Sequence, residues 1–272
     1  MAAIGICIDP VFMNLPYTER VRKIAALGFK KYEFWSENHS LTDKGMIHEQ
    51  KDFSRFAELN AEYGLEITDI LYEPGKDGVK ANLISRGDTG KLVDNFGALA
   101  EQSRKIGCPA FIITGGTVLA GQSRDTSLLN LFYNVSALVK EAEKHRITLL
   151  LEPLNVKIDH RDTFLWDPQT AVDIVKAVNS PFLKVLYDIY HMQIMGGNIL
   201  AFVKENLNHI GHFHIASVPG RNEPYRGELD YGQIVREITG MGYTGNFGLE
   251  YWPTEDVTAS LGKSLRCLMG GE

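Results

Sequence analysis

The feature that most constrains the fold of this chain is a regular alternation between short apolar segments and longer segments with helical periodicity. Each short segment is rich in aliphatic or β-branched residues, and each longer one repeats apolar residues every three to four positions. Strands that alternate with helices favour a parallel sheet, because a crossover helix returns the chain to begin the next strand in the same direction. The expected strands are 4–9, 31–35, 66–73, 110–115, 147–155, 183–191, 210–218 and 246–252.

The helices that this alternation predicts have recognisable start and stop signals. Asp125, Asp167 and Asp256 stand at expected N-cap positions, where a short polar side chain accepts from free backbone N–H groups. Glycines 28, 64, 107 and 242 stand just past helical segments, where a left-handed residue ends a helix. The expected helices are 17–27, 53–63, 92–106, 128–145, 169–178, 199–207 and 231–241, with one more beginning at Asp256.

The number of strand–helix units predicts how the sheet is arranged. Eight units in 272 residues leave about 34 residues for each, an ordinary length for such a unit. We therefore expect an α/β fold in which residues 1–272 form a single TIM-barrel domain, a (β/α)₈ barrel. An open doubly wound sheet is the competing arrangement, but no GxGxxG fingerprint follows the first expected strand.

Composition and charge restrict the partners. The formal net charge is −6, whereas proteins that bind the phosphate backbone usually carry a basic surplus, so no nucleic-acid partner is expected. No apolar run approaches ~18 residues and the first residues carry no basic segment, so we expect neither a membrane span nor a signal peptide. Cys7, Cys108 and Cys267 are too widely spaced for a disulfide framework and are expected to be buried thiols. A reducing cytoplasm fits these thiols, and we expect a small-molecule substrate. A homo-oligomer is expected only because oligomerisation is common for such barrels.

Four successive expected strands carry an ionisable side chain inside or at the end of an apolar run: Glu152, Asp188, His214 and Glu250. In a barrel the strand ends meet at one mouth, which is where active sites form. Three buried carboxylates at one mouth would repel each other unless a cation lay between them. Three carboxylates and one imidazole suit Mn²⁺, Mg²⁺, Co²⁺ or Zn²⁺, whereas Ca²⁺ prefers oxygen alone. One divalent metal ion is therefore the expected cofactor.

Further residues near the expected mouth are candidates for contact with a substrate. His191 follows Asp188 by three residues and could face the substrate, while His212, two residues before His214, is expected to be a core histidine. Arg221 lies in a polar loop after the seventh strand, where it could clamp a carboxylate or pair only with its acidic neighbours. Trp35 and Tyr72 lie at strand ends and could line the pocket or serve only as core packing.

Several motifs carry a resemblance to a known family: LLLEPLN at 149–155, YDIYHMQ at 187–193, IGHFHIASVPGRNEP at 210–224 with GELDY at 227–231, and GLEYWP at 248–253. The sequence resembles the hydroxypyruvate isomerase family, within the xylose-isomerase-like superfamily of sugar isomerases and epimerases. The resemblance implies a divalent metal held by Glu152, Asp188, His214 and Glu250. It also implies that Glu152 and Glu250 carry the proton transfers and that His191 and Arg221 lie near the substrate. One departure is His214, where this family often has glutamine and ketose 3-epimerases have histidine.

The resemblance leads to a hypothesis for the reaction. A metal binds adjacent carbonyl and hydroxyl oxygens and stabilises an enediolate, while Glu152 and Glu250 remove and return the proton. The expected reaction is aldose–ketose exchange, with hydroxypyruvate giving tartronate semialdehyde, and Arg221 or Lys157 would meet the substrate carboxylate. The alternatives are a ketose 3-epimerase acting on tagatose, psicose or ribulose, a 2-oxo-tetronate isomerase, a metal-dependent phosphodiesterase, a dehydratase of inositol derivatives, and a non-catalytic binding protein.

Overall fold

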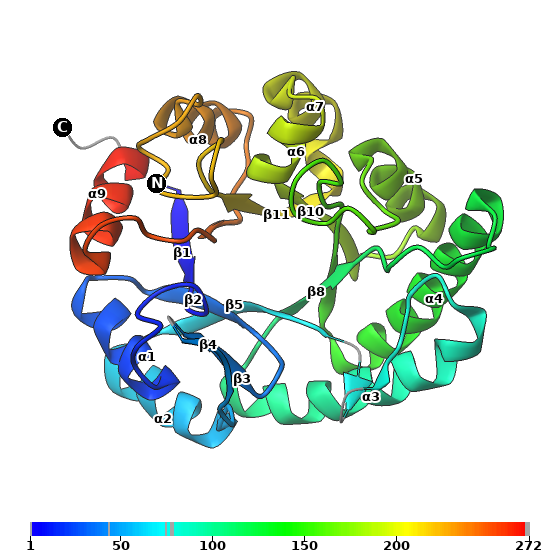
Figure 1. Cartoon of the computed structure of the whole chain (residues 1–272), viewed down its shortest axis with the longest axis horizontal. Coiled ribbons are helices and arrows are strands. Elements are labelled where there is room, and N and C mark those ends of the chain that lie inside the picture. Colours follow the sequence, from blue (N-terminus) through cyan, green and yellow to red (C-terminus); the bar gives the residue numbers. More distant parts are fainter. Residues whose placement is uncertain (1, 43, 74, 77–78, 270–272) are drawn as a thin grey trace.

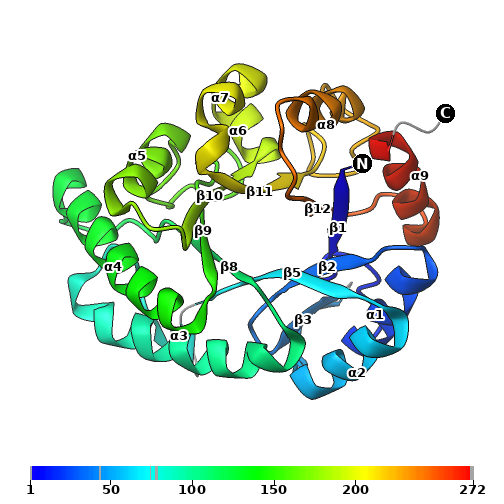
Figure 2. The same cartoon turned by 180° about the vertical axis from the view of Figure 1, so that it is seen from behind.

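The computed structural model describes residues 2–42, 44–73, 75–76 and 79–269. Parallel strands close into a barrel, and the helices form a ring around it (Figures 1 and 2). The strands of the barrel, in the order in which they neighbour each other, are β1 (Ala3–Cys7), β12 (Asn246–Leu249), β11 (Ile210–Ile215), β10 (Leu183–Asp188), β9 (Thr148–Glu152), β8 (Ala110–Thr114), β5 (Glu66–Leu71) and β2 (Lys31–Trp35).

The helices follow the strands along the chain and pack on the outside of the barrel (Figure 1). They are α1 (Tyr17–Ala26), α2 (Phe53–Tyr63), α3 (Thr89–Ser103), α4 (Arg124–His145), α5 (Pro168–Val178), α6 (Ile189–Met195), α7 (Ile199–Asn206), α8 (Tyr231–Gly240) and α9 (Val257–Met269). Short 3₁₀ turns cover Arg86–Asp88, Arg104–Ile106 and Leu207–His209. Two small hairpins, β3 (His39–Thr42) with β4 (Gly45–His48) and β6 (Gly75–Lys76) with β7 (Val79–Lys80), extend the loops after β2 and β5.

The predicted barrel is confirmed, with differences at the ends of elements. Asp167 caps α5 and accepts from Thr170 N at 2.9 Å, as expected. The prediction for Asp125 was wrong: Ser123 caps α4 by accepting from Thr126 N, and Asp125 lies in the first turn. The strand expected over 183–191 ends at Asp188, because this carboxylate accepts from the next free N–H groups and begins α6.

Strand alternation divides the buried side chains into two sets. Leu183, Val185 and Tyr187 of β10 point outward and join the large core between the barrel and the helices. Leu186, between them in sequence, points into the barrel and packs with Ala110, Ile112 and Leu150. Asp188 lies two residues beyond Leu186, so the same alternation directs its side chain into the mouth of the barrel.

The remaining structural expectations concern cysteines and membrane spans. Cys7, Cys108 and Cys267 are all free thiols. Cys7 and Cys108 are buried as expected, but Cys267 is half-buried, because α9 turns this residue partly toward the surface. Within the described part of the chain, no helix is both long and apolar enough to cross a membrane.

Candidate active site at the barrel mouth

The four predicted metal ligands meet at one end of the barrel. Glu152 and Asp188 are the last residues of β9 and β10, His214 is in β11, and Glu250 directly follows β12. All four are buried, with exposed fractions of 5%, 1%, 2% and 7% in that order. His214 Nδ1 lies 3.7 Å from Glu152 Oε1 and 3.5 Å from Glu250 Oε2. Residues up to 98 positions apart in the sequence therefore contribute to one cluster.

The charges of this cluster do not balance within the protein. Arg221 donates to Glu250 Oε2, and its Nη2 lies 3.9 Å from Asp188 Oδ2. One guanidinium thus faces three carboxylates when His214 is neutral, which leaves two negative charges in a buried site. Burying charge without compensation is costly, so a divalent cation matches the deficit in sign and size.

The pKa shifts follow from burial and from these contacts. Burial raises the pKa of Asp188 to about 7, although Arg221 and His214 oppose the shift. Burial alone would also raise the pKa of Glu250, but Arg221 and His214 hold it well below its ordinary value. Burial would lower the pKa of His214, but the surrounding glutamates raise it well above its ordinary value. In the absence of a metal, the cluster favours a proton on His214 as its positive charge.

The donor atoms fit a divalent metal ion. Glu152 Oε1 and His214 Nδ1 are buried and have no hydrogen-bond partner, so their lone pairs are available to a ligand. Asp188, His214 and Glu250 each place one donor atom within 4.8 Å of the others, and so do Glu152, Asp188 and His191. Metal–ligand bonds of about 2.1 Å separate neighbouring donors by roughly 3–3.5 Å, close to the contacts of His214 Nδ1.

His191 reaches this site because the chain changes from strand β10 to helix α6 directly after Asp188. Asp188 Oδ1 accepts from Tyr190 N at 2.8 Å and begins α6, which carries His191 over the mouth. His191 is completely buried, with Nδ1 at 2.7 Å from Asn155 Nδ2 and Nε2 at 3.4 Å from Asp188 Oδ2. Burial lowers the pKa of His191 well below its ordinary value, so the ring is neutral.

Arg221 is held between two aromatic rings. Its guanidinium carbon lies 5.3 Å from the ring centre of Tyr190 and 5.1 Å from that of Trp252. Its backbone carbonyl accepts from Trp252 N at 2.9 Å, which fixes the loop after β11 to the segment after β12. Such stacking leaves the edge of a planar guanidinium free to meet carboxylates.

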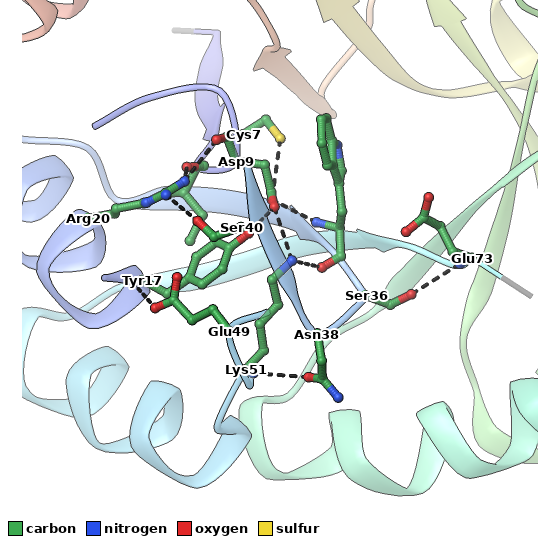
Figure 3. A network of polar contacts seen from close by, with 12 residues as sticks. Cys7, Asp9, Tyr17, Arg20, Ser36, Asn38, Ser40, Glu49, Lys51 and Glu73 are labelled. Carbon is green, nitrogen blue, oxygen red and sulfur yellow. Dashed lines mark hydrogen bonds and ion pairs between the residues drawn. The ribbon is translucent and has the colours of Figure 1, made fainter. Parts of the chain in front are cut away.

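Trp35 joins this cluster to a second buried network around Asp9, drawn in Figure 3. Trp35 Nε1 donates to Glu250 Oε1 at 3.1 Å, and Trp35 N donates to Asp9 Oδ2 at 2.8 Å. Lys51 Nζ donates to Asp9 Oδ1 at 3.0 Å and to the carbonyl of Trp35, and both charged side chains are completely buried. Tyr17 OH also donates to Asp9 Oδ1. This network fixes the backbone of Trp35, and with it the indole that contacts Glu250.

Two sequence candidates have their polar groups directed away from the cluster. Lys157 Nζ donates to the carbonyls of Ile194 and Met195 at 2.8 and 3.0 Å, at the C-terminus of α6. Tyr72 OH donates to the carbonyl of Leu92 at 2.7 Å, although its side chain also lines a cavity of about 450 Å³ beside the strand ends. The structure therefore brings together Glu152, Asp188, His214, Glu250, His191, Arg221 and Trp35.

Sequence reasoning did not single out the polar residues below the mouth. Glu33 and Asp69 are at most 2% exposed and lie beside His212 and His214. Burial would raise the pKa of Glu33, but His214 and His212 lower it to about 2, while burial and Glu33 raise that of Asp69 to about 7. The available signal was an acidic residue in the interior of each of two short strands: Glu33 in Lys31–Trp35 and Asp69 in Glu66–Leu71.

Comparisons with known proteins agree with this architecture. The family model described as "Xylose isomerase-like TIM barrel" matches residues 21–268. A protein of Danio rerio named putative hydroxypyruvate isomerase is 30% identical over 100% of this chain and 99% of its own. A protein of Pectobacterium atrosepticum named 2-oxo-tetronate isomerase is 27% identical over 92% of each chain. A solved structure titled AP endonuclease, family 2, from Brucella melitensis has a TM-score of 0.85 and 27% identity, covering 96% of this chain and 97% of its own.

Proposed function

This chain belongs to the xylose isomerase-like TIM barrel family and is an isomerase, and from that premise we propose that it is a metal-dependent enzyme of the aldose–ketose type. Its substrate is a small α-hydroxycarbonyl acid, and the first candidate is hydroxypyruvate, which would give tartronate semialdehyde. The relative in Danio rerio, named for hydroxypyruvate and matched along the whole chain, supports this choice.

The observation that carries the proposal is the uncompensated charge of the buried cluster. Glu152, Asp188 and Glu250 face one guanidinium, and His214 adds a nitrogen donor. These four residues would hold one Mn²⁺, Mg²⁺, Co²⁺ or Zn²⁺ ion. When bound, such an ion acts as a Lewis acid that stabilises negative charge on the substrate oxygens.

The two glutamates differ in their contacts, and this difference supports a separate role for each. Glu250 accepts from Trp35 Nε1 at Oε1 and from Arg221 at Oε2, so both of its oxygens are engaged. Glu152 Oε1 is buried without a hydrogen-bond partner, so this carboxylate can bind the ion through one oxygen and accept a proton on the other. Glu152 therefore removes a proton from the hydroxyl-bearing carbon beside the carbonyl, and Glu250 returns a proton to the former carbonyl carbon, while the hydroxyl proton passes to the other oxygen. If the proton were instead returned to the opposite face of the carbon that lost it, the reaction would be an epimerisation.

The substrate carboxylate is assigned to Arg221. This guanidinium lies at the mouth, held by Tyr190 and Trp252, and a planar guanidinium can pair with a carboxylate through two hydrogen bonds. Lys157, the other candidate cation, has its ammonium engaged by α6. A longer acid of the same chemistry is the second candidate substrate, supported by the Pectobacterium atrosepticum relative named for 2-oxo-tetronate.

Four broader expectations complete the proposal. We propose that residues 1–272 form one domain, since the described strands belong to one barrel apart from the two short hairpins. A cytoplasmic location is supported by the free thiols, which reducing compartments maintain. A homo-oligomer remains a prediction, tested by the mass of the protein in solution. The net charge of −6 argues against DNA as a substrate.

Removal of the metal is the direct test of the proposed activity. We expect protein loaded with Mn²⁺ to convert hydroxypyruvate and to incorporate deuterium from solvent into the product, and we expect chelation to abolish both. The same assay is repeated with 2-oxo-tetronates and ketohexoses as substrates. The products then distinguish isomerisation of an acid from 3-epimerisation of a ketose. Full activity after exhaustive chelation, with no metal found by elemental analysis, would contradict the proposal.

A further inference from the structure

The interior of the barrel is apolar on one side and polar on the other. Ala110, Ile112, Leu150 and Leu186 form the apolar half, as expected for a packed barrel core. The other half contains two carboxylates and two imidazoles below the mouth. We call these residues the inner cluster: Glu33, Asp69, His212 and His214, each at most 2% exposed.

The backbone around this inner cluster is irregular in a way that makes room for it. The pairing of β2 with β5 shifts between Tyr32 and Phe34, so that Thr68 and Asp69 together lie opposite Glu33. Such a bulge can redirect a side chain, here Asp69, into the barrel. On β12, a Cβ at Gly248 would lie 2.7 and 2.8 Å from the two carboxylate oxygens of Glu33. The glycine therefore leaves the space that the Glu33 carboxylate occupies.

Glu33 contacts both imidazoles with a single carboxylate. Its Oε1 lies 2.9 Å from His214 Nε2, and its Oε2 lies 3.2 Å from His212 Nε2. These are close contacts without the alignment of a hydrogen bond, so Glu33 Oε1 and both Nε2 atoms have no hydrogen-bond partner here. Asp69 Oδ2 lies 3.6 Å from the same nitrogen of His212. The other ring nitrogen of His214, Nδ1, faces Glu152 and Glu250 at the mouth. His214 thus lies between the inner cluster and the proposed metal site.

We infer that Glu33 is a positioning residue: when a metal is bound at Nδ1 of His214, the carboxylate 2.9 Å from Nε2 would accept the Nε2–H and keep the lone pair of Nδ1 directed at the metal. This inference rests on the proposed metal site. A neutral imidazole carries its proton on one nitrogen, and the hydrogen bond made by that nitrogen decides which one is free to bind a metal. A carboxylate behind the ring also makes the imidazole a stronger ligand, and loss of such partners typically lowers metal affinity about 10–100-fold.

The surroundings of Glu33 explain how it can serve as an acceptor inside a barrel. Nε2 of His212 contacts Glu33 Oε2, and Thr68 Oγ1 donates a hydrogen bond to the same oxygen at 3.4 Å. Asp69 Oδ2 lies 3.6 Å from the His212 nitrogen that Glu33 also contacts. The four side chains form a continuous path from Asp69 through His212 and Glu33 to His214.

The test compares two variants on the same wall of the barrel. Glu33→Gln removes the charge at nearly constant volume, while Thr68→Val removes a neighbouring hydroxyl and leaves the contact between Glu33 and His214 intact. With Mn²⁺ titrated into the metal-free protein, we expect one ion per chain in the wild type. We expect the dissociation constant to rise about 10–100-fold in Glu33→Gln and to stay within about threefold of the wild type in Thr68→Val.

A spectroscopic readout keeps the inference testable even if the variant does not fold. In wild-type protein loaded with Zn²⁺, nitrogen-15 NMR is expected to show the proton of His214 on Nε2. Unchanged Mn²⁺ affinity in folded Glu33→Gln would overturn the inference while leaving the proposed function intact. A proton on Nδ1 would overturn the inference and also the proposed binding of the metal through this nitrogen. Two Mn²⁺ ions in the wild type with one lost in Glu33→Gln would also overturn it, because the inner cluster would then be a metal site. Failure of the wild type to bind Mn²⁺ would instead reject the proposed function.

Discussion

Replacing Glu152 by glutamine is expected to lower kcat about 10²–10⁴-fold, the range over which a positioned acid or base contributes to catalysis. Glutamine keeps the shape of the side chain but lacks the second carboxylate oxygen on which Glu152 would accept the proton. The assay is done at saturating Mn²⁺, so that a weaker ligand does not empty the site. Turnover and exchange of the substrate proton with solvent are expected to fall together, since both require removal of the same proton.

Two further variants make this result specific. Glu250→Gln is expected to lower turnover as well, but to leave more of the solvent exchange into substrate, because Glu152 still removes the first proton. Asp173→Asn, on the exposed face of α5, is expected to stay within about twofold of the wild type, since Asp173 is exposed and accepts from Gln169 Nε2 of the same helix at 2.8 Å. Near-normal turnover in Glu152→Gln on the true substrate would show that the assignment of the two glutamates is wrong.

Replacing Lys51 by methionine is expected to destabilise the protein by about 3–5 kcal/mol, since it removes one partner of a buried ion pair. Lys51 and Asp9 are completely buried, and their charged atoms lie 3.0 Å apart (Figure 3). The variant leaves the Asp9 carboxylate with Tyr17 OH and Trp35 N as donors but without its cation. Equilibrium unfolding in urea measures the difference as a lower midpoint at unchanged slope.

The matched control is Lys144→Met, which removes an exposed lysine paired with Glu141 at 2.6 Å. Exposed pairs contribute about 0–1 kcal/mol, so the control is expected to unfold close to the wild type. A Lys51→Met variant as stable as this control would show that the Asp9 network is not essential to the fold. Lower turnover is also expected in Lys51→Met at temperatures where it remains folded, because Trp35 loses the backbone contact that places its indole on Glu250.

The barrel could be predicted because its determinants are local. Apolar runs and capping residues recur along the chain, and strand alternation alone directs Glu152 and Asp188 into the mouth. The predicted strand ends were less accurate where an apolar run continues from a strand into the following helix. Ile189 and Tyr190 resemble a continuing strand, but Asp188 accepts from the backbone of Tyr190 and begins α6. That short helix brings the His191 ring into contact with the side chains of Asn155 and Asp188.

Features that depend on contacts across the barrel could not be predicted in this way. The bulge that directs Asp69 toward Glu33 arises from the pairing of two strands and leaves no mark in either strand alone. The pairing of Asp9 with Lys51 likewise joins the loops after two different strands. Lys157 was placed near the substrate because of its charge and its position after β9, but the free carbonyls at the end of α6 bind its ammonium.

The central claim is that one divalent cation lies among Glu152, Asp188, His214 and Glu250, and anomalous X-ray diffraction from crystals loaded with Mn²⁺ tests it most directly. The expected result is a single strong anomalous peak about 2.1–2.3 Å from a donor atom of each of the four residues, with His214 bound through Nδ1. The absence of a peak among these residues in Mn²⁺-loaded crystals, or a peak bound elsewhere in the barrel, would contradict the account.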